Sequence, residues 1–144
     1  TRERYGFSIE PETDSRRLLA RARAGIVKTG TSTLEAALCG MPHVMMYRTS
    51  TLSYLYAKRL VNLSTIALPN ILMEKVYGRN NVIPELVQTM ATPQALAQAM
   101  VNLLDDTVAG QMTDDFATLR TMLSNGAHGT ASDNAARIIA EMVA

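Results

Sequence analysis

Two short apolar runs flank one helix-length segment near the start of the chain, and this spacing constrains the fold most. The runs are residues 24–27 (AGIV) and 43–47 (HVMMY), and each is too short for a helix. Between them, residues 32–39 read as a helix, which Gly40 ends and which Pro42 keeps from continuing. Buried strands that alternate with helices predict an α/β fold with a parallel sheet.

The rest of the chain continues this alternation. Further strands are expected at residues 5–9 and 65–68, the second one ended by Pro69 because proline cannot donate to a ladder. Helices are expected at residues 14–23, 52–61, 84–88, 93–104, 114–123 and 132–143, and residues 73–82 read as irregular. Asp14 and Thr92 are the expected caps of the first and fourth of these helices. About four strands can be read, which predicts an incomplete sheet.

Composition narrows the class of protein. The 144 residues suffice for one domain, and with 47% apolar and 19% charged residues the chain reads as a globular protein. A net charge of +1 gives no reason to expect nucleic acid, and no apolar run is long enough to span a membrane. Cys39 is alone, so a reducing compartment is expected. The chain opens mid-pattern and without a Met, which suggests a fragment or a processed product.

The stretch KTGTSTLE, residues 28–35, supports two interpretations. Ser32 and Glu35 match a capping box, in which each side chain accepts from the other residue's amide. A capping box leaves Gly30 and its flanking hydroxyls unexplained. A glycine between a buried strand and a helix allows a sharp turn, and the free amides of that helix favour an anion. Neither a Walker lysine loop nor a G-x-G-x-x-G fingerprint is present.

Four segments taken in order resemble one protein family. They are TGTSTLEAALCGMPHVMMYR, YAKRL, LPN and PELVQ. This order resembles the carboxy-terminal half of lipid-A-disaccharide synthase, whose pattern is S-G-T-[AS]-T-L-E-x-x-L-x-x-x-P-M-V-V-x-Y-R, then A-K-R-L, S-L-P-N-L-L and E-L-L-Q. The resemblance runs from about Leu19 to Leu104. It implies a Rossmann-like parallel sheet with flanking helices, part of the carboxy-terminal domain of a GT-B glycosyltransferase. Such an enzyme joins UDP-2,3-diacylglucosamine to 2,3-diacylglucosamine 1-phosphate, with inversion and release of UDP.

The resemblance assigns nucleotide-binding roles to the glycine turn and its helix. Gly30, Thr31 and Ser32 would hold the diphosphate at the helix start. Thr29, where the family has Ser, keeps the hydroxyl beside them. Glu35 matches the acid that related GT-B enzymes use to accept hydrogen bonds from ribose hydroxyls. On this interpretation, Ser32 can cap the helix while the first-turn amides bind phosphate.

Two further residues of the UDP site come from the later motifs. Arg48 would be a cation near the donor cleft, and Asn70 would lie at the end of a strand, where open α/β sheets bind ligands. The resemblance implies no cofactor and a lipid acceptor. It also implies a cytoplasmic location, with contact to the inner membrane as one option. Residues 52–61, with their aromatic and basic side chains, could lie against anionic lipid or pack on the sheet.

The departures from the family pattern leave alternatives open. Eleven residues separate Leu72 from Pro84 where the pattern has about six. The acceptor-binding half, with the carboxylate expected as general base, is not matched. We therefore expect residues 1–144 to be a partial donor domain that holds no catalytic residue and pairs with a missing half or partner chain. A non-catalytic nucleotide-binding or interaction module, or another UDP-sugar transferase or epimerase, remains an alternative. His43 and His128 have no partner at metal-ligand spacing, so no metal site is expected.

Overall fold

Three short parallel strands form the sheet of the part of the chain that the structure describes. This computed structural model describes residues 6, 11–50, 65–124 and 131–143. The strands are β1 (Gly25–Lys28), β2 (His43–Tyr47) and β3 (Glu85–Val87), in the order β1-β2-β3. Val27 pairs with Met45, and Met45 with Glu85. The predicted α/β class with a Rossmann-like parallel sheet is confirmed.

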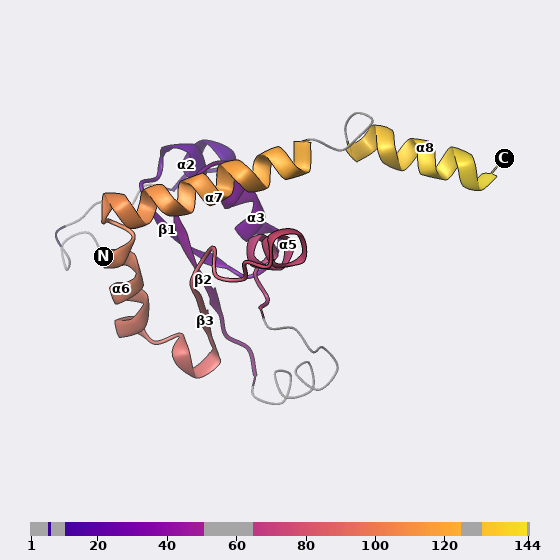
Figure 1. The fold of residues 1–144 in the computed structure, drawn as a ribbon. Helices are drawn as coiled ribbons and strands as arrows, with labels where there is room; N and C mark the ends of the chain where they lie inside the picture. Colours follow the sequence, from indigo (N-terminus) through magenta and orange to yellow (C-terminus); the bar gives the residue numbers. More distant parts are fainter. Residues whose placement is uncertain (1–5, 7–10, 51–64, 125–130, 144) are drawn as a thin grey trace.

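Helices cover both faces of this sheet and the amino ends of its strands (Figure 1). Helices α3 and α5 lie on one face, α6 packs against β1 and β2 on the other, and α7 runs past the amino ends of the strands. The helices are α2 (Ser15–Arg21), α3 (Thr31–Leu38), α5 (Leu68–Tyr77), α6 (Pro93–Asn102), α7 (Asp106–Ser124) and α8 (Ala131–Val143), with a 3-10 turn, η1 (Gln88–Met90). The carboxyl ends of the strands are thus left on the side away from α7.

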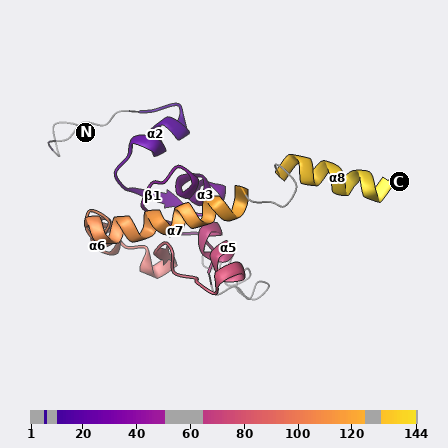
Figure 2. The ribbon, with the colours of Figure 1, turned by 45° about the horizontal axis from the view of Figure 1, so that its top comes forward.

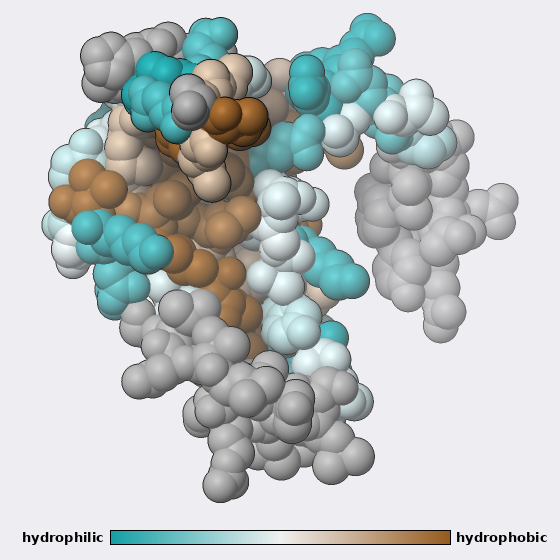
Figure 3. Space-filling model, turned by 90° about the vertical axis from the view of Figure 1, so that its right-hand side faces the viewer, coloured by the Kyte–Doolittle hydropathy of each residue, from teal (hydrophilic) through white to brown (hydrophobic). Residues whose placement is uncertain are grey.

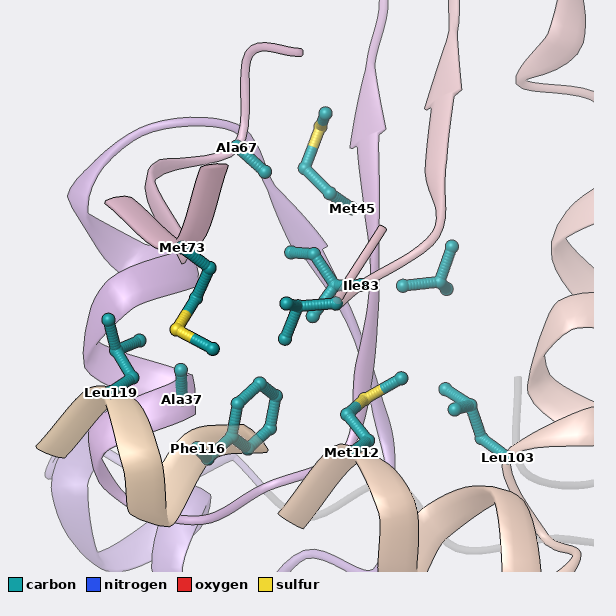
Figure 4. Packing of buried hydrophobic residues seen from close by; sticks show 11 residues of the cluster. Ala37, Met45, Ala67, Met73, Ile83, Leu103, Met112, Phe116 and Leu119 are labelled. Carbon is teal, nitrogen blue, oxygen red and sulfur yellow. The ribbon is translucent and has the colours of Figure 1, made fainter. Parts of the chain in front are cut away.

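The core lies between β2 and the helices α3, α5 and α7 (Figure 4). Met45, Met73 and Phe116 are fully buried in it and come from a strand and two helices. Burial of such side chains stabilises the fold by roughly 1.5–3 kcal/mol each. A second, smaller cluster joins Val27, Ala36 and Met41, and so fixes α3 against β1.

Several of the predicted elements are confirmed. The strand at residues 43–47 has the predicted bounds, and β1 lies one residue later than expected. Asp14 caps α2 by accepting from the amides of Arg16 and Arg17, and Thr92 caps α6. The expected burial of β1 is only partly right. Ile26 is 48% exposed, because β1 is an edge strand of the described sheet.

Two predictions are wrong at the level of element type. Residues 65–68 do not form a strand, since α5 begins at Leu68 with Pro69 in its first turn, where the missing amide costs nothing. This helix continues to Tyr77, so it also takes up half of the stretch expected to be irregular. Residues 84–88 do not form a helix, since Glu85–Val87 is the third strand. Helix α7 also begins earlier than expected, at Asp106.

Two expected elements lie outside the described residues. These are the helix at residues 52–61 and, apart from Gly6, the strand at residues 5–9.

Helix α8 extends away from the other elements in both ribbon views (Figures 1 and 2). Its apolar side chains are largely exposed, with Met142 at 82% and Val143 at 81%. Viewed from the side on which α8 lies, the surface of the molecule shows a broad apolar band (Figure 3). Exposed apolar side chains are therefore present on α8 and on this side of the molecule.

Candidate functional site

The turn from β1 to α3 lies at the carboxyl edge of the sheet. The amide of Thr29 donates to the Met46 carbonyl at 3.1 Å, which keeps the end of β1 beside β2. Gly30 follows with φ 126° and ψ −161°, a backbone conformation that is essentially restricted to glycine. A Cβ on Gly30 would meet no described atom within 4 Å. Conformation, and not space, is therefore what requires glycine at this position.

Helix α3 begins without a side-chain cap. Gly30 is its N-cap residue, and among the described residues no side chain accepts a hydrogen bond from the first-turn amides. The Gly30 carbonyl accepts from the Thr33 amide at 3.2 Å and from the Thr33 hydroxyl at 2.8 Å. Thr31 and Ser32 are exposed. Their amides belong to the first turn, where the helix supplies no carbonyl partner and where its dipole favours an anion.

The predicted capping box is wrong. It placed Ser32 at the N-cap, whereas the N-cap is Gly30, two residues earlier, and the helix begins at Thr31 because the unusual conformation of Gly30 ends the turn. Glu35 does not reach back to the Ser32 amide; its Oε1 accepts from the Ser15 hydroxyl of α2 at 3.2 Å. Glu35 is partly exposed and lies one helical turn from Thr31. Its carboxylate therefore remains accessible beside the start of α3.

Arg48 follows β2 at the same edge of the sheet. Its side chain is exposed, as is that of Lys28 at the end of β1. Two cations and an uncapped helix start therefore lie at neighbouring strand ends, an arrangement that favours an anionic ligand. The structure thus brings together Thr29, Gly30 and the first turn of α3 with Arg48.

Asn70 is not where its motif predicted. It lies in α5 and not at the end of a strand, and its side chain is only 1% exposed. Its Oδ1 accepts from the amides of Val82 and Ile83, both at 2.9 Å. Its Nδ2 donates to the Ile83 carbonyl at 2.9 Å and to Glu85 Oε1 at 2.8 Å. These four bonds use every donor and acceptor of the amide.

Glu85 completes this junction between α5 and β3. Besides Asn70, its carboxylate accepts from the hydroxyl of Thr65 and from the amides of Ile66 and Ala67. A remote carboxylate thus satisfies amides just ahead of α5, as a capping residue would. Glu85 belongs to the PELVQ motif, which by itself assigns it no role. Its partners are 15 to 20 residues away, so no local pattern reveals them.

Gln88 and Thr49 form a second contact that sequence reasoning missed. The Thr49 amide donates to Gln88 Oε1 at 2.8 Å, and Gln88 Nε2 donates to the Thr49 carbonyl at 3.2 Å. This pair lies directly after β2 and β3, next to Arg48. The glutamine that ends PELVQ was the only signal in the sequence.

His43 is buried at the opposite, amino end of β2. Its ring stacks on Phe116 of α7 with centroids 5.5 Å apart, and its Nδ1 is 2.8 Å from the Met41 carbonyl. Burial lowers the pKa of His43 below its ordinary value of 6.5, against the opposing effect of the Met41 carbonyl. A neutral imidazole in the core is a packing residue. The described ranges contain no cluster of three residues that could hold a metal ion.

Comparison with known proteins identifies a family for this arrangement. The lipid-A-disaccharide synthetase family matches residues 6–139. The lipid-A-disaccharide synthase of Pseudomonas entomophila is 37% identical over 119 residues, covering 83% of this chain and 30% of that protein. That of Acidobacterium capsulatum is 39% identical over 112 residues, covering 77% and 27%. That of Neisseria gonorrhoeae is 38% identical over 122 residues, covering 83% and 29%. The chain thus spans about 30% of the length of these relatives.

None of the described helices combines the length and the apolar character needed to cross a bilayer.

Proposed function

The chain belongs to the lipid-A-disaccharide synthetase family, and we propose that it is part of the donor-binding half of such a glycosyltransferase. The donor is UDP-2,3-diacylglucosamine and the acceptor is 2,3-diacylglucosamine 1-phosphate. Transfer forms the lipid A disaccharide and releases UDP. The nucleotide-binding residues are Thr29, Gly30, Thr31 and Ser32, together with Glu35 and Arg48.

The observation that carries this proposal is the uncapped start of α3 at the carboxyl edge of the sheet. Ligands of open α/β sheets bind at this edge. Gly30 has the one backbone conformation here that demands glycine, and no described side chain occupies the amides that follow it. A diphosphate can take those amides as its hydrogen-bond donors.

The chemistry assigned to these residues follows from charge. The bond between the sugar and UDP breaks with negative charge developing on the diphosphate, which the α3 amides and Arg48 stabilise. Glu35 can exchange the Ser15 hydroxyl for a ribose hydroxyl, because both present an O–H donor to the same oxygen. Asn70 is left out of the contact set, since its amide has no bonding capacity remaining.

The remainder of the reaction is assigned to residues outside this chain. Because the chain spans about 30% of its relatives, the acceptor pocket and the general base are proposed to lie in the part that it does not cover. Contact with the cytoplasmic face of the inner membrane, where a lipid acceptor would be found, is part of the same proposal. A site without its base cannot orient an attacking hydroxyl, so the purified chain should show no sugar transfer. Turnover by the chain alone would contradict this division.

A calorimetric titration tests the binding half of the proposal. The chain should bind UDP more tightly than UMP, and UMP more tightly than uridine, because the phosphates make the principal contacts. Replacing Arg48 by Gln should weaken UDP about three- to tenfold, as expected for one charge-assisted bond near a surface. The matched control is Arg137→Gln on α8, whose guanidinium pairs with Glu141 and should leave affinity unchanged. Equal affinities for UDP and uridine would contradict the proposal that the diphosphate binds at the start of α3.

A further inference from the structure

The side chain of Gln88 continues the hydrogen bonding of the sheet beyond the point where its backbone leaves the strand. Pairing between β2 and β3 ends with Tyr47 opposite Val87. One residue later, Gln88 turns into the left-handed region with φ 54°, where its backbone no longer runs along the strand. Its side-chain amide then accepts from the Thr49 amide and donates to the Thr49 carbonyl. A primary amide offers the same two groups as a peptide unit, so it replaces the missing strand pairing.

The backbone conformation of Gln88 marks this position as unusual. Among the described residues it is the single non-glycine residue with positive φ. Glutamine has no special tolerance for that region, which is enriched in Gly, Asn and Asp. Strain of this kind persists where the surrounding structure holds the residue in place, and it clusters at ligand sites. Here the strain aims the amide back at Thr49.

Arg48 is thereby held on both sides. Tyr47, before it, is paired with β3, and Thr49, after it, is bonded to Gln88. We propose that Gln88 is a positioning residue of the nucleotide site, which fixes the backbone of Arg48 at the carboxyl edge of the sheet. This inference rests on the proposed binding of UDP at that edge. It gives Gln88 no direct contact with the nucleotide.

Three variants of the chain test whether the side-chain amide of Gln88 must reach Thr49. Gln88→Asn keeps an amide and tolerates positive φ, but it is one methylene too short to reach Thr49. Gln88→Ala removes the amide altogether. Gln98→Ala is the matched control, because that side-chain amide donates to Asn102 on the same helix.

Two readouts are needed for each variant. Hydrogen exchange of the Thr49 amide, followed by NMR without ligand, reports the contact itself. Calorimetric titration with UDP, well below the thermal midpoint, reports its consequence for binding. Both Gln88 variants should exchange the Thr49 amide at least about tenfold faster and bind UDP roughly five- to tenfold more weakly. Gln98→Ala should match the wild type in both readouts.

The outcomes divide cleanly. Unchanged exchange with weaker UDP binding would mean that Gln88 contacts the nucleotide directly, which overturns a positioning role. Faster exchange with unchanged UDP affinity would overturn it too, since the hydrogen bonds between Gln88 and Thr49 would then serve the fold alone. If the wild type itself binds no UDP, the proposed function fails, and the positioning role fails with it. In that case the exchange rate of the Thr49 amide still shows whether its hydrogen bond to Gln88 forms.

Discussion

The start of α3 and the junction of Asn70 with Glu85 are both built from motif residues, yet they treat their polar groups in opposite ways. At the junction, one buried amide makes four hydrogen bonds and one carboxylate accepts from four groups. At α3, Gly30 is the N-cap after β1, and the exposed first-turn residues have no capping side chain among the described residues. Bonding within the chain therefore divides motif residues into those that hold the fold and those that, on the proposed function, bind the ligand.

The largest effect should come from opening the junction. Asn70→Ala leaves two amides and a carbonyl without their partner in a buried place, and should lower the free energy of unfolding by about 3 kcal/mol. Denaturant unfolding measures this loss. Asn102→Ala is the control, since this exposed residue at the end of α6 should cost under about 0.5 kcal/mol. An Asn70 variant of normal stability that loses UDP binding would reverse the assignment.

Gly30→Ala should follow, and it should affect both properties. A side chain in this conformation should cost about 2 kcal/mol of stability, and the shifted helix start should weaken UDP about tenfold. Gly78→Ala provides a matched comparison, because Gly78 also has positive φ (68°) but ends α5 near α7, away from the carboxyl edge of the sheet. It should lose about 1 kcal/mol of stability and no UDP affinity. Equal UDP affinity for the Gly30 variant and the wild type would show that the turn serves the fold alone.

Glu35→Gln should change binding and leave stability as it is. Gln can still accept from Ser15, so the contact between α2 and α3 survives. A weakened charge-assisted bond to ribose should cost roughly 1–2 kcal/mol of UDP affinity by calorimetry. Glu141→Gln on α8 is the control, with no expected loss of affinity. If both variants bind UDP equally well, Glu35 has no part in the site.

The smallest effect concerns His43, which is buried at the amino end of β2. Because the pKa of His43 is lowered on folding, the unfolded chain is protonated at a higher pH than the folded chain. Stability therefore falls as pH drops below about 6.5. His43→Met removes this proton and should flatten the dependence by about 1 kcal/mol between pH 7.5 and 5.5. Parallel slopes of wild type and variant in pH-dependent melts would mean that His43 is not buried as described. The other histidine is present in both proteins and cancels.

The sequence predicts those parts of the fold that depend on neighbouring residues. The strand at residues 43–47 and the caps at Asp14 and Thr92 follow from local chemistry, and the structure has them. Pro69 is ambiguous, because proline both ends strands and begins helices, and tertiary packing chose the helix.

The sequence predicts the positions of the candidate residues that directly follow a strand, which are Thr29 to Ser32 after β1 and Arg48 after β2. Thr29 to Ser32 lie together at a strand end, as the glycine turn suggested. The role of Asn70 depends on Ile83 and Glu85, and the position of Thr49 depends on a residue 39 places away. Such partners have no local signature. A motif match therefore indicated that these residues matter without showing whether they face a ligand.

The most direct test is an NMR titration of the ¹⁵N-labelled chain with UDP. It observes the backbone amides of Thr31 and Ser32 and the side-chain amide of Asn70 in one experiment. We expect saturable shifts of the Thr31 and Ser32 amides at increasing UDP, with the Asn70 side-chain resonances nearly unmoved. Shifts of the Asn70 side chain with stationary Thr31 and Ser32 amides would contradict it.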